Sequence, residues 1–223
     1  MVNGQGRARP GTPSSKLSMF AHFFGIIAIV LMLVWLLHYG KGLNLNSNDP
    51  GRIFNVHPLL MFCGFIFVAG EAMMVYETVK AGRPMQKLIH IAFQLTALCL
   101  GIVGIYASFK FHKKIHLSHM SSLHAWIGMA TFCLFLLQFL FGLSMLFNPR
   151  IEGERSLPWH VCFGRMLFYM AICTAVSGLM QKQVYLKLKS SPENTLINFI
   201  AIAILLFGIS VELSVSFPRF GNA

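Results

Sequence analysis

The sequence predicts an all-α membrane protein with six transmembrane helices. Of its 223 residues, 56% are hydrophobic and only 11% are charged, which is far too little charge to cover the surface of a soluble domain of this length. The chain also contains six apolar runs of about 20 residues, the length that a helix needs to cross the hydrocarbon layer. The connections between these runs are short, so neighbouring spans should be antiparallel.

The expected spans follow one another along almost the whole chain. They cover residues 20–37, 58–76, 88–108, 124–147, 160–180 and 196–217. The Gly/Pro/Ser-rich start, residues 1–18, is expected to be disordered, and residues 219–223 form a short tail, so that 19–218 make up one transmembrane domain. No small-residue cleavage site follows the first apolar run, which is therefore read as a span rather than as a secretory signal.

The basic character of the chain points to the lipid bilayer as a partner and not to nucleic acid. The formal net charge is +11, but the basic residues fall in short segments between the apolar runs. This placement is typical of loops at a membrane surface. With both termini placed inside, the count of Lys and Arg is nine on the inner side and eight on the outer side, which does not decide the orientation.

Four histidines stand at the ends of the four middle spans. His57 opens the second span and His124 opens the fourth, so these two rings should lie near one face of the membrane. His90 opens the third span and His160 opens the fifth, so this pair should lie near the opposite face. A single histidine at such a place is commonly an interfacial polar group. Four histidines that pair by depth with no remainder favour a role as ligands.

Two imidazoles at one depth suit the axial positions of a haem. A tetrahedral zinc site usually includes Cys or carboxylate ligands, and no carboxylate stands beside any of the four histidines. A haem iron needs only two axial ligands and a large apolar slot, and when both axial positions are filled, electron transfer is favoured over oxygen activation. The chain has no C-x-x-C-H motif for covalent attachment. Small residues near the histidines would leave room for a flat ring: Gly64, Gly101, Gly104, Gly128 and Gly164.

Two alternatives remain open from the residues alone. The stretch HKKIHLSH places His112 and His116 in an H-x-x-x-H spacing that is typical of di-iron enzymes, but such enzymes need several of these boxes and this chain has one. A cationic rim for an anionic substrate fits the stretch better. The second alternative is a histidine-lined proton or metal-ion transporter, which needs polar groups along a path at mid-depth. The span centres carry Phe, Leu, Ile and Met instead.

Seven short stretches carry a resemblance to a known family. In chain order they are HYGKGL, FNVHPLLM, GEAMMVY, KLIHIAFQLTA, FKFH, SLHAWIG and PWHVCFG. Together they resemble the cytochrome b561 family of transmembrane ascorbate-dependent reductases, over essentially all six spans. The resemblance implies two b-type haems, held by His57 with His124 and by His90 with His160 in a central bundle of spans two to five. It also implies a homodimer with both termini in the cytosol, in the plasma membrane or in an endosomal, vacuolar, lysosomal or vesicle membrane.

The resemblance further implies that ascorbate is the cytosolic electron donor. Its binding site corresponds here to Arg83 and Lys87, with either Arg150 or Arg155 from the loop before the fifth span. The chemistry agrees, because ascorbate is a monoanion at neutral pH and cations with hydrogen-bond donors would hold it at the haem edge. Some relatives carry a basic residue after the tyrosine that ends the second span, where this chain has Glu77, which removes one cation from the cytosolic side.

On the opposite side, the resemblance implies an acceptor site for monodehydroascorbate or ferric chelates. This site corresponds to Phe111 and His112, with His116 as an additional candidate. An aromatic ring and an imidazole there could contact the acceptor and pass protons. No catalytic acid, base or nucleophile is predicted.

Two charged residues inside the spans are expected to pair. Glu71 lies 14 residues after His57, or about 21 Å along the second span, and Arg165 lies 5 residues after His160, or about 7.5 Å inward from the cytosolic end of the fifth span. The two side chains therefore share a depth. Because an ionised group within a span usually has a partner, we expect Glu71 and Arg165 to form a salt bridge or to share a water or a haem propionate.

Overall fold

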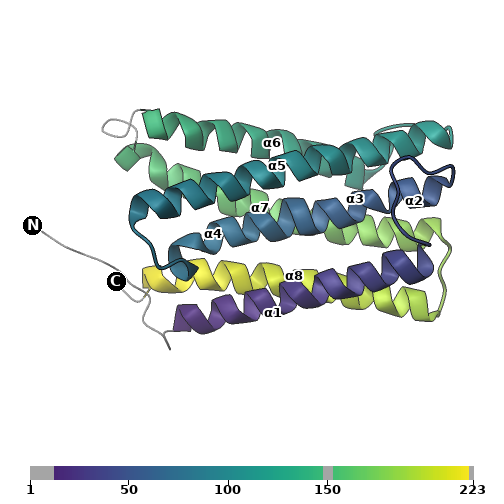
Figure 1. The fold of residues 1–223 in the computed structure, drawn as a ribbon, viewed down its shortest axis with the longest axis horizontal. Helices are drawn as coiled ribbons and strands as arrows, with labels where there is room; N and C mark the ends of the chain where they lie inside the picture. The colour runs from purple at the N-terminus through teal and green to yellow at the C-terminus, as the bar shows by residue number, and fades with distance from the viewer. Residues whose placement is uncertain (1–12, 148–152, 221–223) are drawn as a thin grey trace, which may run out of the picture.

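The computed structural model describes residues 13–147 and 153–220, and these residues are built of helices and short connections. In chain order the helical elements are α1 (Pro13–Val34), η1 (Trp35–Tyr39), α2 (Pro50–Phe54), α3 (Val56–Leu59), η2 (Leu60–Phe67), α4 (Val68–Thr78), α5 (Arg83–Lys114), α6 (Leu123–Phe147), α7 (Gly153–Tyr185) and α8 (Pro192–Phe220) (Figure 1). The two elements labelled η are π-type turns that continue their neighbours. Six continuous helical stretches are long and apolar enough to cross a membrane, which confirms the predicted fold class.

The helices are longer than the apolar runs that predict them. The third span, expected at 88–108, runs over Arg83–Lys114, because polar residues continue the helix beyond the apolar part at both ends. The first helix begins at Pro13. Residues 13–18, which the composition assigned to a disordered start, are therefore helical, while residues 1–12 and 221–223 lie outside the described part of the chain.

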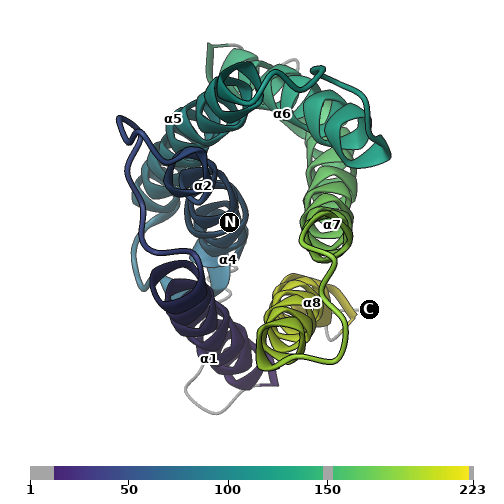
Figure 2. The same cartoon turned by 90° about the vertical axis from the view of Figure 1, so that its right-hand side faces the viewer.

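The six spans form a ring when they are viewed along the bundle (Figure 2). The second to fifth spans follow one another around the ring, and α1 and α8 close it by packing along each other. Helix α8 also contacts α4 and α7, which joins it to both sides of the four middle spans. This arrangement agrees with the expected central bundle of spans two to five, with spans one and six beside it.

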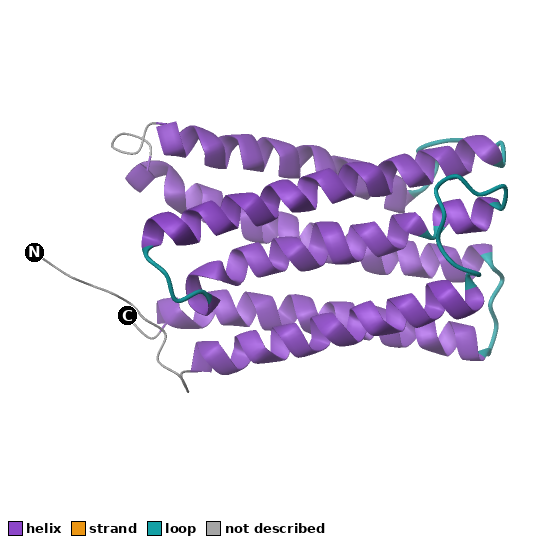
Figure 3. Cartoon of the chain, viewed as in Figure 1, coloured by secondary structure: helices purple, strands orange, loops and turns teal. Residues whose placement is uncertain are grey.

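Short connections hold antiparallel neighbours together at the two ends of the bundle (Figure 3). We call the two ends the His57 end and the His90 end, after the histidine that opens the second and the third span. The turns after η1, α5 and α7 lie at the His57 end, on the right of Figure 1. The start of α1 and the last turns of α8 lie together at the His90 end.

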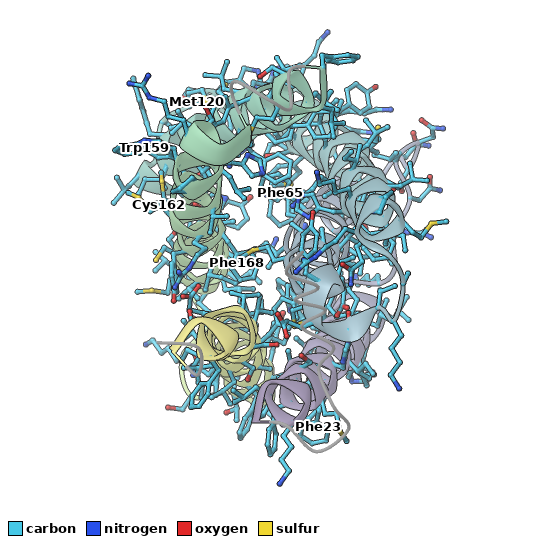
Figure 4. The ribbon with its side chains drawn as sticks, turned by 90° about the vertical axis from the view of Figure 1, so that its left-hand side faces the viewer. Phe23, Phe65, Met120, Trp159, Cys162 and Phe168 are labelled. Atoms are coloured by element: carbon cyan, nitrogen blue, oxygen red, sulfur yellow. The ribbon has the colours of Figure 1, made fainter. Side chains whose placement is uncertain are left out.

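Side chains are buried most completely where α1, α4 and α8 meet. Phe207 and Ile204 of α8, Ala28 of α1 and Ala72 of α4 have no exposed surface. In the described part of α6, Thr131 is the single buried residue. Large apolar side chains such as Phe23 and Trp159, which are 56% and 57% exposed, point outward, as expected of surfaces that face lipid, while Phe65 and Phe168 point into the bundle (Figure 4).

The two charges that were expected to pair have different partners. Nε2 of His22, on α1, lies 2.9 Å from Oε2 of Glu71. Nε of Arg165 donates to Oε2 of Glu212 on α8 at 3.1 Å, and its Nη2 donates to Oγ of Ser216 at 2.7 Å. The expected Glu71–Arg165 bridge is therefore wrong. The rise of the helix fixed only their depth, whereas each side chain faces a different neighbouring helix, which supplies a closer partner.

Candidate functional site

At the His57 end, α3 and α6 bring two imidazole rings together, with their planes nearly perpendicular at 87°. The ring centroids of His57 and His124 lie 6.1 Å apart. Nδ1 of His57 lies 3.0 Å from the carbonyl oxygen of Gly104 on α5, and Nδ1 of His124 lies 3.0 Å from the carbonyl oxygen of Thr174 on α7. Each ring is thereby fixed by the backbone of a third or fourth helix, and the predicted first pair is brought together.

At the His90 end, α5 and α7 bring the second pair together in the same way. The ring centroids of His90 and His160 lie 6.3 Å apart. Nδ1 of His90 lies 2.8 Å from the carbonyl oxygen of Ala72. The side-chain amide nitrogen of Gln138, on α6, lies 3.1 Å from Nδ1 of His160 and donates to the carbonyl oxygen of the same residue at 2.5 Å. The amide of Gln138 therefore orients this ring.

The geometry of both pairs fits a haem iron with two histidine ligands. Two metal–nitrogen bonds of about 2 Å, with about 1 Å from each ring nitrogen to its ring centre, add up to about 6 Å between centroids. An Nδ1–H group that donates to a carbonyl leaves the other ring nitrogen free to bind a metal, and three of the four rings have such a carbonyl partner. The cavity at the His57 end is lined mostly by apolar side chains, among them Met61, Phe62, Phe65, Ile66 and Ile105. Such walls suit a flat apolar macrocycle.

Two glycines that were not among the expected ones make room for the histidine rings. A Cβ atom on Gly178 would lie 2.6 Å from Cε1 of His124, and one on Gly142 would lie 2.8 Å from Cε1 of His160. Among the expected glycines, Gly104 contributes the carbonyl that holds His57, and Gly64 lets Leu100 of α5 approach closely. The sequence does carry the missed signal, because Gly142 and Gly178 each lie 18 residues, or five helical turns, after His124 and His160.

The expected donor residues at the His90 end that the structure describes are exposed. Arg83 lies with its Cζ 5.6 Å from the ring centroid of Tyr76, and that ring lies 5.8 Å from the ring of His90. Lys87 is exposed and lies three residues before His90 on the same helix. Arg155 is exposed near the start of α7, whereas Arg150 lies outside the described residues. Tyr76, which connects Arg83 to His90, was not predicted as a site residue.

The expected acceptor residues at the His57 end are placed differently from one another. Phe111 is buried against Phe54, with ring centroids 4.9 Å apart, and both Phe111 and His112 line the cavity that contains His57 and His124. His116 is exposed and does not line this cavity.

Residues that the sequence reasoning passed over line the same cavity. The ring of His119 lies 5.7 Å from that of His112. Lys182 and Tyr185 come from the end of α7, a segment in which no functional role was recognised. Within residues 13–147 and 153–220, no group of three or more His, Cys, Asp or Glu side chains could hold a metal ion. The structure thus offers the histidine pairs, and not a cluster in HKKIHLSH, as candidate iron ligands.

Comparison with known proteins gives a consistent relationship. The family description of eukaryotic cytochrome b561 matches residues 56–186. The chain is 36% identical over 216 residues to the probable ascorbate-specific transmembrane electron transporter 1 of Oryza sativa subsp. japonica, covering 93% of this chain and 92% of that protein. It is 36% identical over 212 residues to transmembrane ascorbate ferrireductase 2 of Arabidopsis thaliana, covering 92% of each.

A vertebrate relative is similar at the same level. The plasma membrane ascorbate-dependent reductase CYBRD1 of Xenopus laevis is 35% identical over 207 residues, covering 88% of this chain and 72% of that protein. The family match covers more than half of the chain, and these relatives are aligned over nearly all of it. The chain therefore belongs to the eukaryotic cytochrome b561 family.

Proposed function

We propose that this chain is an ascorbate-dependent transmembrane oxidoreductase that carries electrons across the membrane through two b-type haems. The observation that carries the proposal is the placement of the two histidine pairs, His57 with His124 and His90 with His160, at opposite ends of one bundle with ring separations of 6.1 and 6.3 Å. The names of the relatives, as ascorbate-specific electron transporters and ascorbate-dependent reductases, support the donor and the reaction class.

Haem b supplies an iron that gains and loses one electron when it is bound between the rings of each pair. His57 with His124 and His90 with His160 would hold the two irons, and the apolar side chains around the His57 pair would exclude water. Backbone carbonyls of Gly104, Ala72 and Thr174 orient three of the rings. These contacts hold both ligands in place, so that little reorganisation should accompany electron transfer.

Aromatic side chains pack between the two pairs. Phe65 lies eight residues after His57 and seven before Ala72, whose carbonyl oxygen contacts His90, so it lies near mid-depth. Its ring centroid lies 4.7 Å from that of Phe135 and 5.6 Å from that of Phe132, both on α6. These rings fill the middle of the bundle with apolar material, which favours electron transfer and opposes the passage of ions.

We place the His90 end in the cytosol, with ascorbate as the donor there. The exposed cations Arg83, Lys87 and Arg155 surround this end, and they can hold an ascorbate monoanion beside Tyr76 and His90. In this orientation both termini are cytosolic, since α1 starts and α8 finishes at the same end (Figure 1). Arg150, the alternative loop candidate to Arg155, remains part of the proposal although it lies outside the described residues.

We place the acceptor at the His57 end, beside Phe111 and His112. Monodehydroascorbate and ferric chelates are the proposed acceptors, and each of them takes up one electron. His116 is exposed at the same end and can contact an acceptor only outside the cavity. The protein is proposed to act as a homodimer, in the plasma membrane or in an endosomal, vacuolar, lysosomal or vesicle membrane.

Reconstituted vesicles test the proposed function. Vesicles that contain the purified protein are loaded with ascorbate, and ferric citrate is added outside together with a chelator that reports ferrous iron. The proposal predicts ferrous iron outside that depends on internal ascorbate and is lost in vesicles without protein. Vesicles that hold the haem-loaded protein but form no more ferrous iron than empty ones would contradict the proposal.

A further inference from the structure

We propose that Lys182 binds a negatively charged oxygen group at the haem pocket of the His57 end, and that this lysine is a positioning residue for electron delivery to the acceptor. The inference deepens the proposed function and rests on it. The chemical class of the ligand is a carboxylate or another oxyanion. Two sources carry this chemistry, namely a propionate of the haem and the anionic acceptor itself.

The position of the ammonium group supports this role. Lys182 lies at the end of α7 and lines the cavity that also contains His57 and His124. Its Nζ lies 4.2 Å from the ring centroid of Phe54 and 5.5 Å from that of Tyr185. The ring of Phe54 lies 5.9 Å from that of His57. A single aromatic ring therefore separates the cation from the axial ligand.

Lys182 forms no salt bridge within the described residues. No carboxylate there lies within salt-bridge distance of its Nζ, and no described group makes a hydrogen bond with it. The carboxylate of Glu193 on α8 attracts Lys182 electrostatically without forming a salt bridge, and it accepts a hydrogen bond from Nε1 of Trp35 at 3.0 Å. Contact with aromatic faces stabilises a cation only partly, so a half-buried ammonium in this place favours an anion.

The rest of the cavity rim agrees with an anionic ligand. His112 and His119 line the same cavity as Lys182 and can donate hydrogen bonds to an oxyanion. Both proposed acceptors, monodehydroascorbate and ferric chelates, are anions. In the acceptor step one electron leaves the reduced protein and one acceptor molecule gains it, so the step needs no further reactant. A nearby cation would raise the local concentration of such acceptors and orient them.

The test compares Lys182→Met with Lys182→Arg, which keeps the charge, and with Lys189→Met, which removes an exposed lysine from the same end. Each purified, haem-loaded protein is reduced with dithionite, so the result does not depend on ascorbate as the donor. Its reoxidation is followed by stopped-flow absorbance with two oxidants, the anion ferricyanide and a cationic ferrocenium carrying a trimethylammonium group. The midpoint potentials and the haem content are measured in parallel.

If the acceptor is the ligand, Lys182→Met lowers the rate with ferricyanide by about ten-fold or more, because a charge-assisted contact is lost. The rate with the ferrocenium stays unchanged or rises, the potentials do not change, and Lys182→Arg keeps most of the rate. If a haem propionate is the ligand, Lys182→Met lowers the potential of one haem, accelerates haem loss and changes both rates alike.

If Lys182→Met has the same reoxidation rates, midpoint potentials and haem content as Lys189→Met, the inference is overturned and the proposed function stays intact. A purified protein that holds no haem, or haem that ascorbate does not reduce, would instead overturn the proposed function. The two failures are therefore distinguishable.

Discussion

Gly142 and Gly178 explain how two bulky imidazole rings fit between closely packed helices. Helices α6 and α7 are antiparallel, and each carries a histidine near its start and a glycine five turns later. The glycine of each helix faces the histidine of the other. The same spacing on two antiparallel helices thus creates a reciprocal contact at each end of the bundle.

Replacing Gly178 by Ala should weaken haem binding at the His57 end. The added Cβ would lie 2.6 Å from Cε1 of His124, so the ring must move away from its position. We expect the haem content of the purified protein to fall toward one per chain, measured by the pyridine haemochrome assay. Gly82→Ala is the matched control, because the nearest atom to its Cβ is 3.8 Å away. Full haem content in Gly178→Ala would contradict this account of the glycine.

Replacing Lys87 by Ala should weaken the use of ascorbate without changing the haems. Lys87 is exposed one helical turn before His90, where it can contact an ascorbate anion. We expect the ascorbate concentration for half-maximal reduction to rise about ten-fold, as for loss of a charge-assisted hydrogen bond. Reduction by a neutral, membrane-permeant quinol should stay the same. Lys80→Ala removes an exposed lysine from the connection that precedes α5, and it should behave like the unchanged protein. Equal losses with both donors would indicate damage to the haem site instead.

At the scale of the elements, polar groups inside the spans attach α1 and α8 to the middle four helices. His22 and Glu71 join α1 to α4, while Arg165, Glu212 and Ser216 join α7 to α8. Oγ of Ser18 and Oγ of Ser214 lie 2.5 Å apart and join α1 to α8. Apolar surfaces give little direction to helix association in lipid, so these contacts help to specify which helices are neighbours.

The sequence could predict the depth of these groups but not their partners. Depth follows from counting residues along a helix, which predicted the two histidine pairs that the structure brings together. The partner depends on the rotation of each helix and on the order of helices around the ring, which no residue count contains. Phe207 of α8 contacts Phe168 of α7 and lies against Gly70 of α4, so α8 occupies the space next to Arg165 and supplies Glu212.

Glu212→Gln should destabilise the protein through Arg165. Removing one partner of a buried ion pair typically costs about 3–5 kcal/mol, because the other charge is left without compensation. We expect a lower Tm in detergent for Glu212→Gln, with part of the loss recovered when Arg165→Met is added. The matched comparison combines Glu71→Gln with Arg165→Met. These two side chains are not in contact, so the changes in Tm that each substitution causes should add. The contacts would be contradicted if the changes in Tm were additive for Glu212→Gln with Arg165→Met but not additive for Glu71→Gln with Arg165→Met.

At the scale of the whole molecule, the ring of spans holds one histidine pair near each face with aromatic side chains between. Six spans, the central bundle and both pairings follow from the hydrophobic runs, the antiparallel rule and the positions of the histidines. The walls of the pockets do not follow from these patterns. Lys182 reaches the cavity of His57 from a helix that is distant in sequence, and the ring contacts of Tyr76 with His90 and of His119 with His112 depend on how the chain turns between consecutive helices.

The most direct test of the central account is the haem content of double histidine variants. The unchanged protein should bind two haems per chain. His90→Ala with His160→Ala removes both ligands of one pair and should leave one haem, and so should His57→Ala with His124→Ala. His57→Ala with His90→Ala breaks both pairs and should leave none. A colourless unchanged protein, or a variant that lacks both His57 and His90 but still binds a full haem, would contradict the account.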